Sequence, residues 1–178
     1  MGNLGEWKIN PTTKLPQKIA SLELKLFGAE YEIKMYLGSQ LVNGTRHAVL
    51  AEQTVITGVD TKNAVILVLN EKSGVTDLAL ESIVPIANGG GKLGGMNIDI
   101  QIEDDMPKEA MDVYHDSAYE LLGSSIKPIA FLGKQVTKGT DYRLLATSTP
   151  VTLEGEPSLA VVTVNNMEKI VKAKHIEL

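Results

Sequence analysis

The sequence predicts an α+β protein made of two similar units, each with one helix packed across a four- to five-stranded antiparallel sheet. The first observation is a repeat, because Leu37–Ala51 returns as Leu132–Ala146 after a shift of 95 residues. The second is a helical spacing of apolar residues ahead of each copy. The third is strand-like alternation after it. One helix stripe and one sheet face can cover each other, which is enough for a small core.

The repeat extends beyond that stretch and defines the expected domains. Residues 28–70 and 123–165 share eleven identities at the same shift. Between the copies lies the segment IANGGGKLGGM, whose five glycines offer little side chain to pack. We therefore predict two similar domains over 1–87 and 96–178, joined by a glycine-rich linker over 88–95. A phosphate-binding loop is the alternative for the linker, but Leu93 stands where such a loop needs Ser or Thr.

Apolar spacing predicts one helix of about four turns in each copy. In the first copy the stripe ends before Gly28, where a left-handed residue would close a helix, and it consists of Leu15, Ile19, Leu22 and Leu26. In the second copy it ends before Gly123 and consists of Met111, Tyr114, Ala118 and Leu121. Asp104 and Asp105 are expected to cap the second helix, with Pro107 in its first turn.

Strands are predicted on both sides of each helix. In the first copy, alternating or continuous apolar runs mark 6–10, 31–37, 48–50, 64–69 and 75–86. In the second copy they mark 96–102, 126–132, 142–149, 159–164 and 170–176. Asn43-Gly44 and Lys138-Gly139 are expected to form the tight turn of the first hairpin after each helix. Each unit should then have the order β-α-β-β-β-β.

Composition argues against several classes of function. The formal net charge of −5 and the pI near 5.2 argue against a nucleic-acid-binding surface. The absence of cysteine excludes a disulfide framework, a thiolate metal site and a cysteine nucleophile. No apolar run reaches the roughly 18 residues of a membrane span, and the first residues lack the features of a signal peptide. We expect a cytoplasmic protein without a membrane span; a signal peptide removed from the N-terminus is the open alternative.

Neither a catalytic site nor a metal site is expected. The histidines at 47, 115 and 175 are too scattered in sequence for an obvious triad or ligand set. Ser124-Ser125 lacks the glycines of a nucleophile elbow. The acidic run 103–105 lacks the alternating oxygen ligands of a calcium loop and is better explained by helix capping. We therefore predict a protein that is not an enzyme and needs no cofactor.

The hairpin in each copy resembles the signature of the cystatins, and the absence of cysteine resembles the stefin type in particular. The family signature is Gln-x-Val-x-Gly, placed in a hairpin after a helix and a strand. The first copy matches it at Gln40, Val42 and Gly44. The second copy keeps its ends but has Thr in the middle place, as Gln135, Thr137 and Gly139. Glycines before each first strand, Gly5 and Gly94-Gly95, look like the family's N-terminal trunk.

The resemblance implies a function as an inhibitor. Cystatins block papain-like cysteine peptidases by wedging the trunk, this hairpin and a second hairpin bearing Pro-Trp into the active-site cleft. The resemblance therefore implies a tandem thiol protease inhibitor. The peptidase-binding residues that it assigns are Gly5, Gln40, Leu41, Val42, Asn43, Gly44, Gly94, Gly95, Gln135, Val136, Thr137, Lys138 and Gly139. The second hairpins, expected at 71–74 and 165–167, both lack Pro-Trp and hence the aromatic anchor.

Two other interpretations remain beside the inhibitor. The first is a protein-interaction or structural module with the same fold and no inhibitory activity. In that case the hairpins are simply good turns. The second is a ligand pocket on the concave face of each sheet. That pocket is disfavoured because the helix stripe is expected to cover the apolar residues of the sheet.

Overall fold

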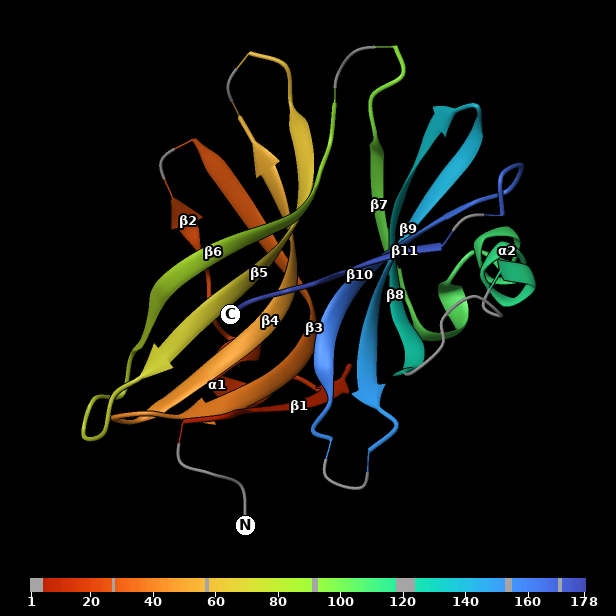
Figure 1. Cartoon of the computed structure of the whole chain (residues 1–178). Coiled ribbons are helices and arrows are strands. Elements are labelled where there is room, and N and C mark those ends of the chain that lie inside the picture. The colour runs from red at the N-terminus through yellow and green to blue at the C-terminus, as the bar shows by residue number, and fades with distance from the viewer. Residues whose placement is uncertain are drawn as a thin grey trace. The chain divides into compact units, whose positions relative to one another are not determined.

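The computed structural model describes residues 5–26, 28–56, 58–90, 93–117, 124–152, 155–169 and 171–178. The chain forms two compact units. Unit 1 ends at Ile86, and unit 2 is Ala87–Glu177. Each unit is built around one antiparallel sheet (Figure 1). In the described parts of the chain, neither helix has the length and apolar character needed to cross a membrane.

Unit 1 has six strands in one sheet. The order is β1-β3-β4-β5-β6, and the short β2 pairs with β3. The bounds are β1 Trp7–Thr12, β2 Lys25–Leu26, β3 Ala29–Leu41, β4 Thr45–Val55, β5 Thr61–Glu71 and β6 Leu78–Asn88. The long central strands pair from end to end, so that Leu41 lies opposite Thr45 and Thr45 opposite Glu71. This register brings the β3–β4 turn and the end of β5 to the same end of the sheet.

The predicted four-turn helix of the first copy is wrong. The helix α1 is a single turn, Gln17–Ala20, and Lys25–Leu26 form β2 instead. Gly28 has φ of +80° and lies in the turn between β2 and β3. The physical reason lies in residues 22–26, where leucine alternates with a charged residue. That period of two fits a strand as well as a helix, and the strand pairing with β3 prevails.

The apolar residues of this segment still cover one face of the sheet. Ile19 of α1 is buried in a cluster that also contains Val49, Ala51, Val65, Leu67 and Leu69. Leu15, Leu22 and Leu24 are partly buried against the same cluster, although none of them lies in α1. The sequence therefore identified Leu15, Ile19 and Leu22 as covering residues but not their backbone conformation. It missed Leu24, and the predicted Leu26 is 41% exposed.

Unit 2 has five strands in one sheet, in the order β11-β10-β9-β8-β7. The bounds are β7 Asn97–Ile102, β8 Ser124–Thr137, β9 Gly139–Pro150, β10 Ser158–Asn165 and β11 Val171–His175. The helix α2, Lys108–Ser117, contributes Ala110 and Tyr114 to a buried cluster on one face of the sheet. The strand residues of this cluster are Phe131, Tyr142, Leu144, Ala146, Val162 and Val164.

The N-terminal end of α2 differs from the predicted capping. Asp104 and Asp105 lie in a separate 3₁₀ turn, Glu103–Asp105, which ends at Met106. Pro107 comes directly before α2, and its carbonyl oxygen accepts the Met111 amide at 3.2 Å. Gly123, the expected end of the helix, lies outside the described residues.

The predicted fold class is wrong. We expected two cystatin-like domains with a long helix across each sheet, whereas the chain consists of two sheet-dominated bodies whose helices, in the described residues, are α1, the short η1 turn and α2 (Figure 1). The strands are longer than the apolar runs suggested, since the predicted strand 48–50 is part of the eleven-residue β4. Polar residues at strand ends continue the backbone pairing, which the apolar pattern alone does not reveal.

Candidate functional site

The repeated hairpin lies at the end of each sheet. In unit 1 it joins β3 to β4, and the Val42 amide donates to the Gly44 carbonyl oxygen at 3.1 Å. Asn43 and Gly44 both have positive φ, 47° and 115°, which are the values that an Asn-Gly turn accepts at low cost. The predicted turn at Asn43-Gly44 is confirmed. In unit 2, Thr137 pairs with Gly139 across Lys138, so the predicted Lys138-Gly139 turn is confirmed as well.

In both units, steric crowding explains why the last residue of the hairpin turn is glycine. A Cβ added to Gly44 would lie 2.4 Å from the backbone oxygen of Glu71. A Cβ added to Gly139 would lie 2.6 Å from Oδ1 of Asn166 and 2.8 Å from Cγ of Met167. The two glycines are therefore required where the segment after β5 in unit 1, or after β10 in unit 2, approaches the hairpin. Their repetition follows from the fold.

The two glutamines hold the segment that leads into the first strand. In unit 1, Nε2 of Gln40 donates to the Gly5 carbonyl oxygen at 2.6 Å, and Oε1 accepts from Nη1 of Arg46 at 2.9 Å. In unit 2, Nε2 of Gln135 donates to the Gly94 carbonyl oxygen at 2.8 Å. The structure thus gives the signature glutamine the same structural role in both copies.

The expected trunk glycines take part in the same arrangement. Gly5 and Gly94 have φ of 100° and 84°, a left-handed conformation that favours glycine. Gly95 is close to Gly90, whose oxygen would lie 2.4 Å from an added Cβ, and the Gly90 amide donates to the Met96 carbonyl oxygen at 3.1 Å. The described part of the predicted linker is therefore a folded turn, while Gly91 and Lys92 lie outside the described residues.

A further pair of repeated glycines lies deeper in each sheet. A Cβ added to Gly38 on β3 would lie 2.3 Å from the Lys8 oxygen on β1. The same distance separates a Cβ added to Gly133 on β8 from the Asn97 oxygen on β7. In both units a backbone oxygen of the first strand lies close to a glycine of the hairpin strand with which it pairs. The glutamines, the hairpin glycines and this pair of strand glycines therefore have structural roles in both copies.

The exposed apolar residues at the hairpin tips have no such role. Leu41 and Val42 are 53% and 39% exposed, and Val136 in unit 2 is 72% exposed. Single exposed apolar residues are common on protein surfaces and need no explanation. Leu41 and Val42 differ because they are adjacent and line a groove. They are the predicted site residues with the clearest capacity for binding.

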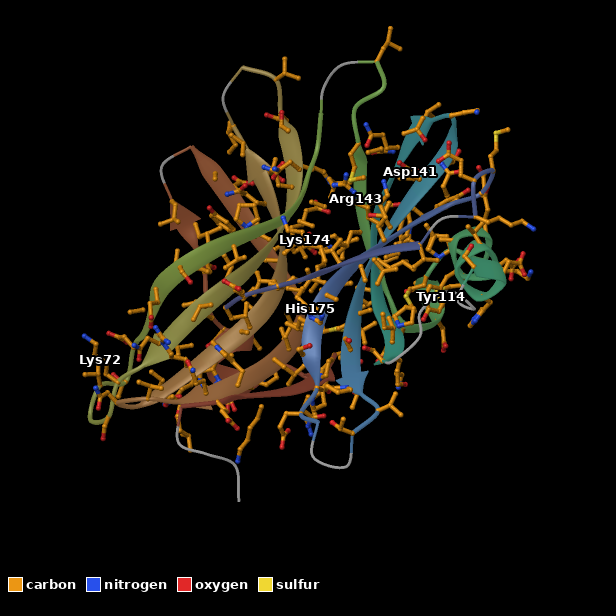
Figure 2. The ribbon with its side chains drawn as sticks, viewed as in Figure 1. Lys72, Tyr114, Asp141, Arg143, Lys174 and His175 are labelled. Carbon is orange, nitrogen blue, oxygen red and sulfur yellow. The ribbon has the colours of Figure 1, made fainter. Side chains whose placement is uncertain are left out.

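The groove lies in unit 1 between the β3–β4 hairpin and the β5–β6 turn, and its volume is ≈ 750 Å³. Its lining comes from α1 and from the two turns, as Lys18, Leu41–Thr45 and Glu71–Thr76. Val75 adds a third exposed apolar side chain. Lys72 lies at the tip of the β5–β6 turn (Figure 2) and makes no ion pair within the described residues. The groove therefore has an apolar wall and a free cation on its rim.

A chain of polar contacts fixes one side of this groove. The Lys18 ammonium pairs with Oε1 of Glu71, whose Oε2 lies 3.1 Å from Nε2 of His47. Nδ1 of His47 lies 2.9 Å from the Tyr36 hydroxyl. The hydrogen bond from Lys18, followed by that from His47, lowers the pKa of the Glu71 carboxyl, while burial raises the pKa of Tyr36. These contacts tie α1 to the end of β5 and keep the wall of the groove in place.

Sequence reasoning did not identify this network. The scattered histidines gave no reason to expect a role for His47, whose side chain is only 13% exposed. The contact between His47 and Glu71 can be inferred once β4 and β5 are paired, because His47 lies opposite Leu69 and Glu71 is the next residue on the same face of β5. Lys18 carried no such signal, since its position depends on α1 being a single turn.

The same end of unit 2 is arranged differently. Nδ2 of Asn165 donates to Oδ1 of Asp141 at 2.7 Å. The Oδ1 atom of Asn165 accepts the Met167 and Glu168 amides, both at 2.8 Å. Oδ1 of Asn166 accepts the Thr140 amide at 2.9 Å. These bonds fold the second turn against the hairpin, where side chains of the turn approach Gly139. A cavity of ≈ 210 Å³ beside this hairpin is lined by polar and charged residues, as Thr137, Lys138, Asp141, Thr163, Asn165, Glu168 and Lys172.

The other candidate chemistry stays apart from these hairpins. Among the described residues, no group of three or more histidine, aspartate or glutamate side chains is placed to hold a metal ion. The His115 ring packs edge-on against Tyr114 of the same helix. Nδ1 of His175 lies 3.4 Å from the Ser158 hydroxyl on the neighbouring strand.

Comparison with known proteins assigns no family to the chain. No protein-family model, curated protein or solved structure matches it.

Proposed function

We propose that this chain is a non-enzymatic protein-binding protein and that the groove of unit 1 is its contact surface. The observation that carries the proposal is the exposure of Leu41 and Val42 on one wall of a groove of ≈ 750 Å³. Folding does not require apolar residues at these tips, because the turn depends on Asn43 and Gly44. Removing two adjacent apolar side chains from water would stabilise a complex.

The geometry favours a preformed contact surface. The hairpin is held at its base by Gln40 and Arg46, and the facing wall is held by the Lys18–Glu71 pair. A partner would therefore meet a surface that loses little conformational entropy on binding. In unit 2 the cavity beside the hairpin is lined by polar and charged residues, so we assign the main contact to unit 1.

Inhibition of a papain-like cysteine peptidase is the second candidate. One specific observation favours it: the segment at Gly5, the β3–β4 hairpin and the β5–β6 turn gather at one end of unit 1. This is the number and order of pieces that the resemblance to cystatins implies. The β5–β6 turn offers Val75 in place of an aromatic anchor, so we expect weaker binding than an aromatic anchor would give.

Site-specific photo-crosslinking tests the contact surface. A photoreactive amino acid would replace Val42 in one variant and Leu26 in another, because these side chains have similar exposed fractions of 39% and 41%. We expect a covalent adduct with a discrete protein of the source cell from position 42 and none from position 26. The adduct should disappear when Leu41→Asp is added. Equal adducts at both positions, or none at position 42, would refute the proposed surface.

A papain titration separates the second candidate from the first. The intact protein, Leu41→Asp and the matched Leu26→Asp should be compared, since glycine substitutions at position 44 would also disturb the turn. Inhibition by the intact protein and Leu26→Asp, with loss in Leu41→Asp, would support cleft occlusion. Failure of the intact protein to inhibit would remove this candidate and leave the crosslinking test unaffected.

A further inference from the structure

The strand β11 forms one edge of the sheet in unit 2 and pairs only with β10 among the described strands. Lys172, Ala173, Lys174 and His175 are all exposed. An exposed edge strand offers unpaired amides and carbonyl groups to another extended chain. The free edge of β11 is therefore a surface onto which a further strand can be added.

The register identifies which backbone groups are free. The Ile176 amide donates to the Leu159 carbonyl oxygen at 3.0 Å, beyond the last paired residues of the strand. In an antiparallel pair, hydrogen-bonded and non-hydrogen-bonded positions alternate. Lys172 and Lys174 are thus bonded to β10, while Val171, Ala173 and His175 direct their amides and carbonyl groups away from the sheet.

The side chains give this edge a charge of its own. Val171 packs against the buried cluster beneath α2, so residues 171, 173 and 175 face that side of the sheet. Lys172 and Lys174 project from the other side, and neither makes an ion pair within the described residues. Lys174 and His175 can be seen on β11 in Figure 2. The strand contains no acidic residue, although the whole chain has a formal net charge of −5.

We infer that β11 binds an extended acidic segment of another protein by strand addition. Its backbone would pair with the free groups of Val171, Ala173 and His175. Carboxylates at every second position would lie on the same side as Lys172 and Lys174 and form ion pairs with them. Lysines on an edge strand commonly prevent self-association, and here they repel basic strands while attracting acidic ones. This surface is independent of the groove of unit 1.

Fluorescence anisotropy with a labelled peptide tests the inference on the full chain. The probe is a peptide of about six residues that alternates valine and glutamate, and its control has lysine in place of glutamate. We expect saturable binding of the glutamate peptide, weakened by salt, and none of the lysine peptide. Replacing both Lys172→Glu and Lys174→Glu should weaken binding about tenfold or more. Lys127→Glu, an exposed charge change on the inner strand β8, should leave binding unchanged.

A proline variant separates strand addition from simple charge attraction. Ala173→Pro removes one outward amide without removing a bond to β10, and edge strands tolerate proline at such positions. We expect it to abolish peptide binding while the thermal midpoint stays within a few degrees. Unchanged binding in Ala173→Pro would overturn strand addition. No binding of the glutamate peptide to the wild type, or an equal loss in Lys127→Glu, would overturn the site even if the proline variant fails to fold.

Discussion

The side chain of Gln40 is bonded to the backbone of Gly5, 35 residues earlier in the chain, with Nε2 and the carbonyl oxygen 2.6 Å apart. Unit 2 repeats this relationship between Gln135 and Gly94 at 2.8 Å. The repeated glutamine thus holds the segment before the first strand by a side-chain hydrogen bond, which we call the glutamine clamp. Binding of a partner protein would then depend on the neighbouring hairpin residues, which are Leu41 and Val42 in unit 1 but Val136 and Thr137 in unit 2.

The clamp predicts a loss of stability for Gln40→Leu. This change keeps the side-chain volume but removes the bond to Gly5 and leaves Nη1 of Arg46 without Oε1 as acceptor. We expect the free energy of unfolding to fall by about 1 kcal/mol and the amides of β1 to exchange faster. Chemical denaturation and hydrogen exchange measure the two effects. Gln17→Leu, at an exposed position, is the control, and an unchanged unfolding energy in Gln40→Leu would exclude the clamp.

The close approach of β1 to β3 predicts a larger effect at Gly38. An alanine Cβ would lie 2.3 Å from the Lys8 oxygen, so β1 must shift or detach. We expect Gly38→Ala to lower the free energy of unfolding by about 1–3 kcal/mol. Gly58→Ala is the matched control, because Gly58 has φ of +83° but nothing within 4 Å of an added Cβ. It should cost only about 1 kcal/mol from its left-handed backbone. Equal losses in the two variants would contradict the steric explanation.

The sequence predicted the hairpins better than the helices. Asn43-Gly44 has a strong local preference for a tight turn, so few neighbouring residues were needed to locate it. The segment 22–26 has no such preference, because its alternation fits a strand and its apolar spacing fits a helix. Pairing with β3 decided the outcome, and that contact is invisible in a local pattern.

The candidate site was predictable only in part. Leu41 and Val42 could be identified from the repeat, since they lie inside the signature. Their groove could not, because its opposite wall comes from the turn after β5 and from Lys18 on α1. The bond between Gln40 and Gly5 depends on the register of β1 against β3, in which Gln40 lies opposite Trp7. These two segments are about 35 residues apart in the chain, so a local sequence pattern does not show which residue Gln40 will contact.

The Glu71 carboxyl predicts an acid-sensitive contribution to the stability of unit 1. Its pKa is lowered by the hydrogen bond from Lys18 and then by that from His47. A lowered folded-state pKa means that the contribution is present above the ordinary value of 4.5 and is lost as pH falls through the lower folded value. Between neutral pH and pH values below 4.5, wild type should therefore lose more stability than Glu71→Gln. Urea denaturation at a series of pH values measures the difference.

The control for Glu71 is Glu30→Gln, which removes the same charge at an exposed position of β3. It should retain the acid-dependent loss seen in wild type. Parallel pH profiles for wild type and Glu71→Gln would show that the Lys18–Glu71–His47 contacts do not contribute to folding.

Tyr142 predicts the opposite pH dependence in unit 2. It occupies the position that corresponds to His47, and its hydroxyl donates to the Glu109 carboxylate on α2. Burial, followed by this bond to Glu109, raises the pKa of Tyr142 to about 12 from an ordinary value of 10.0. The protonated form is therefore favoured by folding, so its contribution is complete below pH 10.0 and is lost as pH rises towards about 12.

Tyr142→Phe should remove this alkaline dependence while lowering stability at neutral pH, because the Glu109 carboxylate loses its donor. Lysines titrate in the same range, so the informative quantity is the difference in unfolding free energy between wild type and variant at each pH. We expect that difference to shrink steadily above pH 10.0. Tyr31→Phe in unit 1 provides the control, since it removes a hydroxyl that accepts a bond from Gln53 on the neighbouring strand. A difference for Tyr142→Phe that stays constant up to about pH 12 would mean that the hydroxyl is not held protonated by its buried position beneath α2.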